Sequence, residues 1–208
     1  MARYTGPACR ICRRQGMKLF LKGTKCVTEK CPFNKRGYAP GDHGQNRVKL
    51  SDYGLQLREK QKVKRMYGML ERQFRKTFQQ ASQAKGVTGE KLLELLERRL
   101  DNVVYRLGFA SSRAQARQVV RYGHVTVNGH RVDIPSFVVE AGQTIRVVGS
   151  EKFLKSVKET CESIKDRPLP PWLNRHAEQP EGTIVGRPGR GDVQFPIQEQ
   201  LIVELYSR

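Results

Sequence analysis

The segment from Ser111 to Asp133 constrains the fold of this chain more than any other, because it contains two strong local signals in succession. The first signal is a helix start. Ser112 stands three residues before Gln115, the spacing at which a hydroxyl and a side-chain amide cap a helix N-terminus reciprocally. The predicted helix carries three arginines at successive steps of four residues, so they share one face: Arg113, Arg117 and Arg121.

The second signal is a tight hairpin. Gly123 ends the predicted helix, and residues 124–127 alternate between polar and apolar side chains, as a half-buried strand does. The Asn128-Gly129 pair that follows favours a two-residue turn, because both residues tolerate positive φ. Residues 130–132 then form the second strand of the predicted hairpin.

A leucine-rich helix is predicted upstream, with Thr88 as its cap and Gly108 as its stop. Its apolar residues fall on one stripe: Leu92, Leu96, Leu100, Val103 and Leu107. We expect this helix, the arginine helix and the hairpin to fold together as one small module at residues 97–159.

The arginine face of this module has two interpretations. Most charged helix faces are simply solvated, but the charges on this face all have one sign. A row of guanidinium groups beside a tight hairpin suits the phosphate backbone of a folded RNA better than base edges alone. We therefore favour an RNA-binding module.

The charge of the whole chain also favours a polyanionic partner. The 208 residues carry a net charge of +19, and residues 1–76 hold 20 basic but only 5 acidic side chains. No apolar run approaches the ~20 residues that span a bilayer, and no hydrophobic signal region begins the chain. We expect a cytoplasmic protein with no membrane association and no small-molecule substrate.

Four of the five cysteines lie within the first 31 residues, at Cys9, Cys12, Cys26 and Cys31. In a reducing compartment, thiols paired at short spacing indicate a metal site rather than disulfides. Closed coordination by four thiolates is typical of a structural metal, whose binding folds a polar segment that lacks a core. We predict one structural zinc ion; an iron–sulfur cluster is the alternative that the sequence leaves open.

The other residues predict a mostly helical body. Ser51 or Asp52 caps a densely basic helix that reaches Tyr67, and a second helix is expected at residues 69–84. The fifth cysteine, Cys161, falls on the apolar stripe of a further helix, where it is expected to be a small buried hydrophobe.

The last part of the chain, residues 196–206, is expected to return to the body as a strand. The predicted fold class is therefore α+β. It comprises a metal-stapled N-terminal arm at residues 1–50, a mostly helical body with a C-terminal strand at residues 51–96 and 160–208, and an inserted helix–helix–β-hairpin RNA-binding module at residues 97–159.

Catalytic signatures are absent from the sequence: there is no phosphate-binding loop ending in Gly-Lys-Ser/Thr, no His-Glu-x-x-His and no Gly-x-Ser-x-Gly. Arg99-Leu100-Asp101 resembles the Arg-Leu-Asp of pseudouridine synthases, in which the aspartate attacks the base. Leu100, however, belongs to the leucine stripe, and no large catalytic domain remains elsewhere. We interpret Asp101 as a structural carboxylate on the helix surface.

Two rival functions stay open at this point. One is an RNA-modifying enzyme that uses the module for delivery. The other is a metal-stabilised DNA-binding regulator, which is disfavoured because neither a dimer interface nor two parallel recognition modules are evident.

Motifs spread over the whole chain resemble the family of bacterial small-subunit ribosomal protein four. They are Arg3-Tyr-Thr-Gly-Pro7 ahead of Cys9-Arg-Ile-Cys-Arg-Arg14, Pro40-Gly-Asp-His-Gly44, SDYGLQLREKQ at residues 51–61, Leu70-Glu-Arg-Gln-Phe74, RLDNVVYRLGF at residues 99–109, and the ending EQLIVELYSR. The cysteine quartet resembles the metal-bearing branch of that family.

The resemblance implies a non-enzymatic, ribosome-bound protein. Members of the family bind the 5′ domain of 16S rRNA at a multi-helix junction and nucleate assembly of the small subunit. They contact small-subunit ribosomal protein five, line the mRNA entry path with protein three, affect translational accuracy, and in some bacteria repress their own mRNA.

The residues predicted to contact RNA are basic, aromatic and polar side chains of the arm, the basic helices and the module, whose charges would neutralise phosphates where RNA helices converge. They are Arg3, Tyr4, Arg10, Arg13, Arg14, Lys22, Tyr38, His43, Gln45, Arg47, Tyr53, Arg58, Lys60, Lys62, Lys64, Arg65, Arg72, Arg113, Gln115, Arg117, Arg121, His124, Asn128 and Arg131.

Overall fold

The computed structural model describes residues 3–46, 49–164, 168–176 and 179–207. The chain divides into two compact units, Met1–Leu92 with Phe195–Arg208, and Leu93–Gln194. The division falls within α5 (Thr88–Glu97). Among the described residues, no helix has the length and apolar character needed to cross a membrane.

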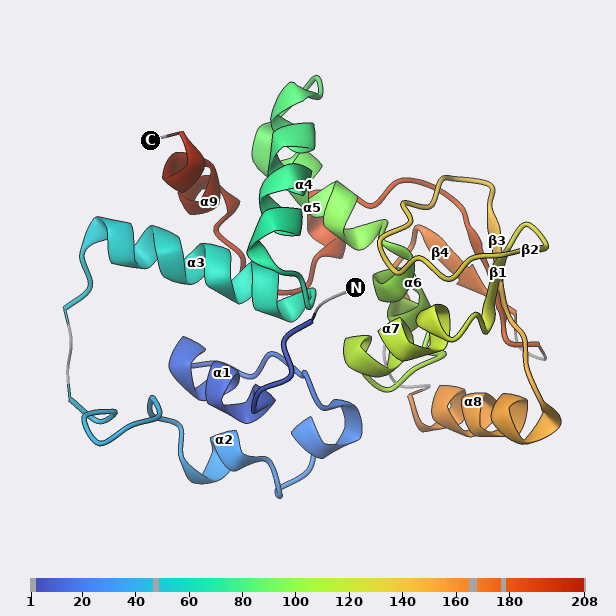
Figure 1. Cartoon of the computed structure of the whole chain (residues 1–208), viewed down its shortest axis with the longest axis horizontal. Coiled ribbons are helices and arrows are strands. Elements are labelled where there is room, and N and C mark those ends of the chain that lie inside the picture. Colours follow the sequence, from blue (N-terminus) through green and yellow to red (C-terminus); the bar gives the residue numbers. More distant parts are fainter. Residues whose placement is uncertain (1–2, 47–48, 165–167, 177–178, 208) are drawn as a thin grey trace. The chain divides into compact units, whose positions relative to one another are not determined.

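The first unit begins with the cysteine-containing arm, drawn in blue in Figure 1. Its short elements are α1 (Ala8–Gln15), the 3₁₀ helix η1 (Gly23–Cys26) and α2 (Pro32–Lys35). α1 ends at Gly16, which has φ 67°, a backbone conformation that glycine adopts at little cost. Leu19 is fully buried in the arm, together with three of the cysteines.

Besides the beginning of α5, the first unit contains the helices α3 (Asp52–Met66), α4 (Glu71–Gln83) and α9 (Glu199–Tyr206). The Ser51 hydroxyl accepts a hydrogen bond from the Gly54 amide at 3.2 Å, so the predicted cap is confirmed. The ring of Tyr206 stacks on Phe78, with centroids 4.5 Å apart, and lies 6.3 Å from Phe74. α9 therefore packs with α3 and α4, as Figure 1 shows.

The C-terminal segment is a helix, and the prediction of a strand at residues 196–206 is wrong. The run Leu201-Ile202-Val203 is apolar, and two of its three residues are β-branched, which also suits a strand. Gln56 on α3 donates to the Glu204 carboxylate at 3.0 Å, and the Tyr206 hydroxyl donates to Glu71 at 3.0 Å. Packing against two helices thus overrides the local β-propensity.

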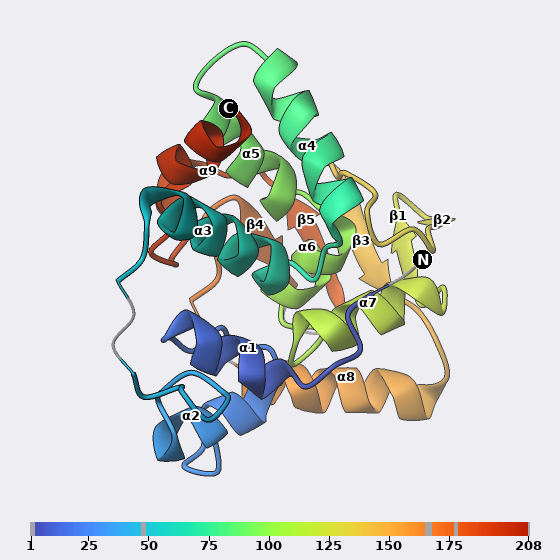
Figure 2. The same cartoon turned by 60° about the vertical axis from the view of Figure 1, so that its left-hand side comes forward.

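The second unit consists of a sheet and the helices around it, shown from two sides in Figures 1 and 2. Its helices are the remainder of α5, α6 (Leu100–Arg106), α7 (Arg113–Arg121), α8 (Glu151–Ser163) and the 3₁₀ helix η2 (Arg190–Asp192). The strands, all antiparallel in the described residues, are β1 (Val125–Val127), β2 (His130–Arg131), β3 (Thr144–Val147), β4 (Leu173–Arg175) and β5 (Glu181–Ile184), in the order β2-β1-β3-β5-β4.

The hairpin between β1 and β2 is the one that the sequence predicts. Val127 pairs with His130, and Asn128 and Gly129 occupy the turn with φ 49° and 85°. The Asn128 side chain also accepts a hydrogen bond from the Thr144 amide at 2.8 Å, which ties the turn to β3.

The core of the second unit lies between the sheet and helices α6, α7 and α8. Buried residues from all of these elements contribute to it, including Leu100, Val120, Ile145, Val157 and Trp172. Trp172, which follows Pro170 and Pro171, is 4% exposed and anchors that turn to the core. Cys161 is half-buried and packs against this core, where its thiol donates to the Gly108 carbonyl at 3.4 Å.

The predicted leucine-rich helix is broken in two. Arg99 has extended backbone angles (φ −65°, ψ 135°) between α5 and α6, and it pairs with Val138 in an isolated bridge. The amides of Leu100 and Asp101 donate to the Phe137 and Pro135 carbonyls at 2.8 and 3.2 Å. The carbonyls of the loop at residues 135–137 thus accept hydrogen bonds from the first amides of α6. The periodicity of the leucines does not reveal this break, because the loop is distant in sequence.

The second unit is larger than the predicted module. β4 and β5 lie in residues 160–194, which the sequence analysis placed in the helical body, and both belong to the sheet. Thr144 pairs with Thr183, and Leu173 pairs with Ile184. The α+β class is confirmed, but long-range strand pairing extends the second unit to Gln194.

Candidate RNA-binding surface

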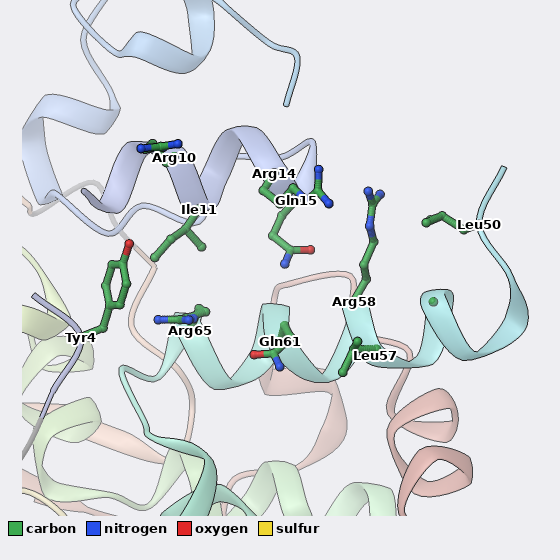
Figure 3. Close-up of a pocket in the computed structure, with 11 residues that line it drawn as sticks. Tyr4, Arg10, Ile11, Arg14, Gln15, Leu50, Leu57, Arg58, Gln61 and Arg65 are labelled. Atoms are coloured by element: carbon green, nitrogen blue, oxygen red, sulfur yellow. The ribbon is translucent and has the colours of Figure 1, made fainter. Parts of the chain in front are cut away.

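A basic groove lies between α1 and α3 in the first unit. It has a volume of about 500 Å³, and Figure 3 shows side chains of both helices around it, with Tyr4 at one end and Leu50 at the other. Its described lining residues are Tyr4, Arg10, Ile11, Arg14, Gln15, Leu50, Gly54, Leu57, Arg58, Gln61 and Arg65. None of these is acidic, so four guanidinium groups share the groove without a carboxylate among its described walls.

The groove is built by sequence spacing on two short helices. Arg10 and Arg14 stand four residues apart on α1, and Arg58 and Arg65 stand seven residues apart on α3, so each pair occupies one helix face. The Arg65 guanidinium lies 4.3 Å from the centroid of the Tyr4 ring, a cation–π contact that fixes this end of the groove. Like charges facing one another across open space attract a polyanion.

Lys60 and Lys64 lie on the side of α3 opposite Arg58 and Arg65, whereas Lys62 lies one turn from Arg58; all three lysines have carboxylate partners. Lys60 and Lys64 each contact the Glu71 carboxylate at 2.6 Å, and Lys62 contacts Glu59 at 2.6 Å. All three lysines are buried. Burial raises the pKa of Glu71, but hydrogen bonds from Lys60, Lys64 and Tyr206 outweigh it and hold that pKa at about 2.

The four cysteines of the arm line one small cavity together with Ala8, Leu21, Lys22 and Phe33. Burial raises the pKa of the Cys12 and Cys26 thiols, and the neighbouring cysteines raise both further. The Lys22 amide donates a hydrogen bond to the Cys26 sulfur at 3.3 Å. Within the described residues, no group of three or more His, Cys, Asp or Glu side chains is arranged to hold a metal ion as it stands, so the stapling metal stays a prediction.

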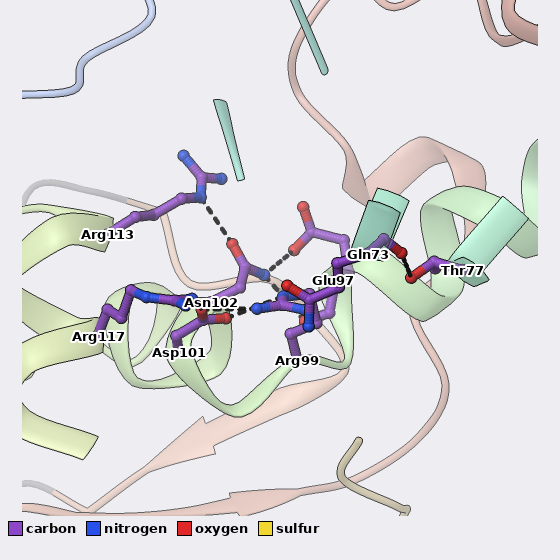
Figure 4. Close-up of polar contacts among 8 residues, drawn as sticks. All are labelled: Gln73, Thr77, Glu97, Arg99, Asp101, Asn102, Arg113 and Arg117. Atoms are coloured by element: carbon purple, nitrogen blue, oxygen red, sulfur yellow. Dashed lines mark hydrogen bonds and ion pairs between the residues drawn. The ribbon is translucent and has the colours of Figure 1, made fainter. Parts of the chain in front are cut away.

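A buried polar network occupies the N-terminal half of the second unit, and Figure 4 shows it. Asp101 is 4% exposed and lies between two arginines: both of its oxygens accept hydrogen bonds from Arg99, at 3.1 and 2.9 Å, and Arg117 contacts it at 3.0 Å. Asp101 is therefore a structural carboxylate, as predicted, but it lies inside the unit and not on the helix surface.

The other half of this network is centred on Glu97. Its carboxylate accepts two hydrogen bonds from Arg106, at 3.0 and 2.7 Å, and one from Asn102 at 2.7 Å. The Asn102 carbonyl in turn accepts a hydrogen bond from Arg113 at 2.8 Å, and the Arg113 guanidinium lies 4.6 Å from the centroid of the Tyr105 ring. Arg106 and Arg113 are thus tied to Glu97 directly and through Asn102, as Arg99 and Arg117 are tied to Asp101.

The expected row of three exposed arginines on α7 does not form. Arg113 and Arg117 are each 8% exposed and bind Asn102 and Asp101, whereas Arg121 is exposed. Helical spacing puts the three side chains on one face, but it does not say which of them meets a carboxylate. Burial lowers the pKa of Arg117, and Asp101 opposes that effect.

The capped start of α7 and the hairpin hold the other predicted residues of the module. The Ser112 hydroxyl accepts from the Gln115 amide at 3.3 Å, while the Gln115 side chain accepts from Ser111 and not from Ser112. His124 is half-buried, and its ring is tilted by 31° against that of Phe153, with centroids 4.4 Å apart; a ring nitrogen lies 3.1 Å from the Val148 carbonyl oxygen.

Comparisons with known proteins agree with this architecture. The family model described as "Ribosomal protein S4/S9 N-terminal domain" matches residues 3–97, and the "S4 domain" model matches residues 98–145. Proteins called small ribosomal subunit protein uS4 from Thermodesulfovibrio yellowstonii, Thermoanaerobacter sp. strain X514 and Geobacter sp. strain M21 are 61%, 58% and 56% identical to this chain over 208 residues. In each case the match covers 100% of both chains.

The chain belongs to the uS4 family of small-subunit ribosomal proteins.

Membership in the uS4 family confirms the resemblance drawn from the sequence motifs. It implies that the chain binds 16S rRNA within the small subunit and works on ribosomes in the cytoplasm. The family is one of structural ribosomal proteins, not enzymes, which excludes an RNA-modifying enzyme as the function of this chain.

The uS4 chain brings some of the predicted RNA contacts together and separates others. Tyr4, Arg10, Arg14, Arg58 and Arg65 meet at the groove. Arg13 lies elsewhere, where its guanidinium donates to the Tyr38 and Ala39 carbonyls at 2.9 and 3.3 Å and lies over the Tyr38 ring. Arg13 therefore anchors the loop after α2.

The remaining predicted contacts are scattered over the surface. Side chains that are exposed in the structure are Arg3, Lys22, His43, Gln45, Tyr53, Arg72, Arg121, Asn128 and Arg131, and Arg47 lies outside the described residues. The sequence analysis missed Gln15 and Gln61, which line the groove. Gln61 lies one turn from Arg58, a spacing that could have indicated it, whereas Gln15 directly follows Arg14 and has no such signal.

Proposed function

We propose that this uS4 protein is a primary binder of 16S rRNA that nucleates assembly of the small subunit through the 5′ domain of that RNA. The observation that carries the proposal is the groove between α1 and α3, in which Arg10, Arg14, Arg58 and Arg65 converge and no acidic side chain is among the described lining residues. The rRNA backbone is the ligand proposed for this groove.

The chemistry of the groove suits phosphates better than a protein or a small molecule. Guanidinium groups bind phosphate oxygens through two parallel hydrogen bonds, and each neutralised phosphate releases condensed counterions. The described residues offer these four arginines no carboxylate in the groove, unlike the lysines on the other side of α3. A rigid set of positive charges at a junction of RNA helices lowers the repulsion between the helices and favours the compact junction.

The test is binding of the purified protein to a 5′-domain transcript across a salt series, with excess tRNA and duplex DNA as competitors. Retained binding with a steep salt dependence supports the proposal. The logarithm of the binding constant falls as the logarithm of the salt concentration rises. We expect Arg10→Ala, Arg14→Ala and Arg58→Ala each to make this negative slope shallower by about 0.9. Transcripts of the other 16S rRNA domains, which are expected to bind more weakly, serve as RNA controls.

Lys85→Ala is the matched protein control, because Lys85 is exposed beyond the C-terminal end of α4 and outside the groove. It should leave the salt slope close to that of the wild type. Equal loss of binding to every competitor would show a nonspecific polycation and would contradict the proposal.

The family resemblance extends the proposal further. We expect contacts with small-subunit ribosomal proteins five and three, a position along the mRNA entry path, an effect on translational accuracy, and possible repression of the protein's own mRNA. What supports these expectations is the resemblance of the chain's motifs to the family. Autorepression has a simple test: the leader of the protein's own mRNA should compete with the 5′-domain transcript, and a leader that competes no better than tRNA contradicts it.

We also propose one structural zinc ion in the arm, with an iron–sulfur cluster as the alternative. The support is that all four thiols line one cavity and that a backbone amide already donates to the Cys26 sulfur, as amides do around metal-bound thiolates. When bound, the metal would supply folding free energy to a polar segment. The ligands would be Cys9, Cys12, Cys26 and Cys31, and their role would be to hold α1 and its arginines beside α3.

A further inference from the structure

Tyr122, at the C-terminal end of α7, exposes a large aromatic ring that the fold does not use. The side chain is 66% exposed, more than any other aromatic residue described. Its backbone is nevertheless fixed: the Tyr122 amide donates to the Gln118 carbonyl at 2.9 Å, which closes the last turn of α7. A ring that projects from an ordered backbone loses little conformational freedom when it binds a partner.

Arg131 is held beside Tyr122 by the hairpin. Its guanidinium donates to the Tyr122 carbonyl at 3.2 Å, and β1–β2 pairing places Arg131 opposite Thr126. The guanidinium sits over the bare backbone of Gly123, where a Cβ would clash with it, and φ of +73° at that position favours glycine independently. Arg131 is exposed and keeps donors that Tyr122 does not use.

The charges around the ring indicate the kind of partner. Arg121 precedes Tyr122 and is exposed, and the Arg131 guanidinium is bound to the Tyr122 carbonyl, so two cations lie close to this residue in the structure. An apolar protein surface would have to desolvate both of these charges. An unpaired nucleotide offers a base for the ring and a phosphate for a guanidinium, and proteins commonly recognise single-stranded RNA in this way.

We propose that Tyr122 stacks on an unpaired base of the rRNA while Arg131 binds the phosphate next to that base. The proposal rests on the proposed function, because it assumes that rRNA is the ligand. It assigns RNA contact to Tyr122, which the sequence motifs do not mark, and it gives Arg131 a fixed orientation toward the same nucleotide.

The test separates stacking from charge by comparing Tyr122→Ala, Tyr122→Phe, Tyr122→Leu and Arg131→Ala in the full-length protein with the 5′-domain transcript. Loss of one stacked base weakens binding about tenfold, so Tyr122→Ala should lose affinity at every salt concentration with an unchanged salt slope. Tyr122→Phe should retain affinity. Arg131→Ala should lower the slope by about 0.7, the value for one phosphate of a single strand.

Val185→Ala is the matched control, because Val185 is an apolar side chain of the same unit that is 65% exposed. It should bind as the wild type does. Thermal melts of all variants should coincide with that of the wild type, since the Tyr122 ring and Val185 are not in the core.

A second readout identifies the contact directly. Ultraviolet irradiation of the complex should crosslink the transcript to the peptide that contains Tyr122, and the adduct should disappear in Tyr122→Ala. If Tyr122→Ala binds like the wild type, or if Tyr122→Leu binds as well as Tyr122→Phe, the stacking proposal is overturned while the proposed function stands. If the wild type does not distinguish the 5′ domain from tRNA, the proposed function itself fails.

Discussion

Arg117 and Asp101 form a buried ion pair within the second unit, with Arg117 Nη1 3.0 Å from Asp101 Oδ2 and the two residues 16 positions apart in the chain. Arg99 binds both oxygens of the same carboxylate. The pair joins the N-terminal end of α6 to α7, and it explains why an aspartate in an Arg-Leu-Asp motif is structural here. Asp101 is held between two guanidinium groups and is not presented to a substrate.

Replacing Asp101 with asparagine should destabilise the second unit. The amide keeps the shape of the side chain but leaves Arg99 and Arg117 buried without their shared carboxylate. Breaking a buried ion pair in this way lowers the free energy of unfolding by about 3 kcal/mol. The free energy of unfolding from urea titration, followed by Trp172 fluorescence, measures the effect. Asp133→Asn, at an exposed position, should change it by less than about 0.5 kcal/mol, and equal stability of the two variants would contradict a structural role for Asp101.

Arg121→Ala should change RNA binding, whereas Arg117→Ala should change the stability of the fold. Arg121 is exposed, so its loss should lower the salt slope of rRNA binding by about 0.9 and leave the melting temperature unchanged. Arg117 is buried against Asp101, so its loss should lower the melting temperature. The prediction that Arg117 also contacts a phosphate is retained only if Arg117→Ala makes the salt slope shallower at a temperature where the variant is folded.

Stability should depend on pH through Glu71. Its pKa is about 2 in the folded protein and near 4.5 in the unfolded chain, so the unfolded state binds the proton first as pH falls. The ionised Glu71 carboxylate therefore contributes fully to the free energy of unfolding above about pH 4.5, and this contribution is lost between pH 4.5 and about pH 2. We expect Glu71→Gln to be less stable than the wild type by about 1 kcal/mol at neutral pH, a value limited by solvent screening because the side chain is 45% exposed.

The measurement for Glu71 is the difference in unfolding free energy between wild type and Glu71→Gln at several pH values. The difference should shrink as pH falls below 4.5. Glu90→Gln, at an exposed position on α5, is the control and should show little difference at any pH. A difference that grows on acidification would show that the lysine contacts with Glu71 do not lower its pKa.

Metal removal should unfold the arm without unfolding the second unit. If the zinc proposal is correct, elemental mass spectrometry should find about one zinc ion per chain in the purified protein. The Cys12→Ser variant should contain no zinc. Cys161→Ser is the matched control, because that thiol packs against the core of the second unit and donates to the Gly108 carbonyl. Iron with visible charge-transfer absorption would favour the cluster instead, and full structure without any metal would contradict both.

Local features of this chain were predictable because their causes lie within a few residues. Ser51, Ser112 and Ser150 each cap the helix that follows, with amide-to-hydroxyl distances of 3.2, 3.3 and 3.4 Å. The Asn128-Gly129 turn adopts the positive φ values that the pair predicts. Cap and turn chemistry involve neighbours in sequence, so the sequence is sufficient to recognise them.

The candidate site was predictable only in part. The groove unites five residues that the sequence marked, because spacing on α1 and α3 placed each arginine pair on one helix face. The lysines of α3 have the same charge and lie on the same helix, yet Glu59 and Glu71 neutralise them. Which basic residues face solvent depends on which of them meet a carboxylate in the folded structure, and charge density along the chain does not contain that information.

The sequence by itself determined the family, the capped helices, the hairpin and the basic N-terminal third, because motifs, caps and net charge are properties of short segments. Only the tertiary structure decided that residues 199–206 are helical, that β4 and β5 complete the sheet, and that Asp101 and Arg117 are buried together. Each of these rests on contacts between residues far apart in the chain. Packing and the desolvation of paired charges favour such contacts, and neither is encoded in local periodicity.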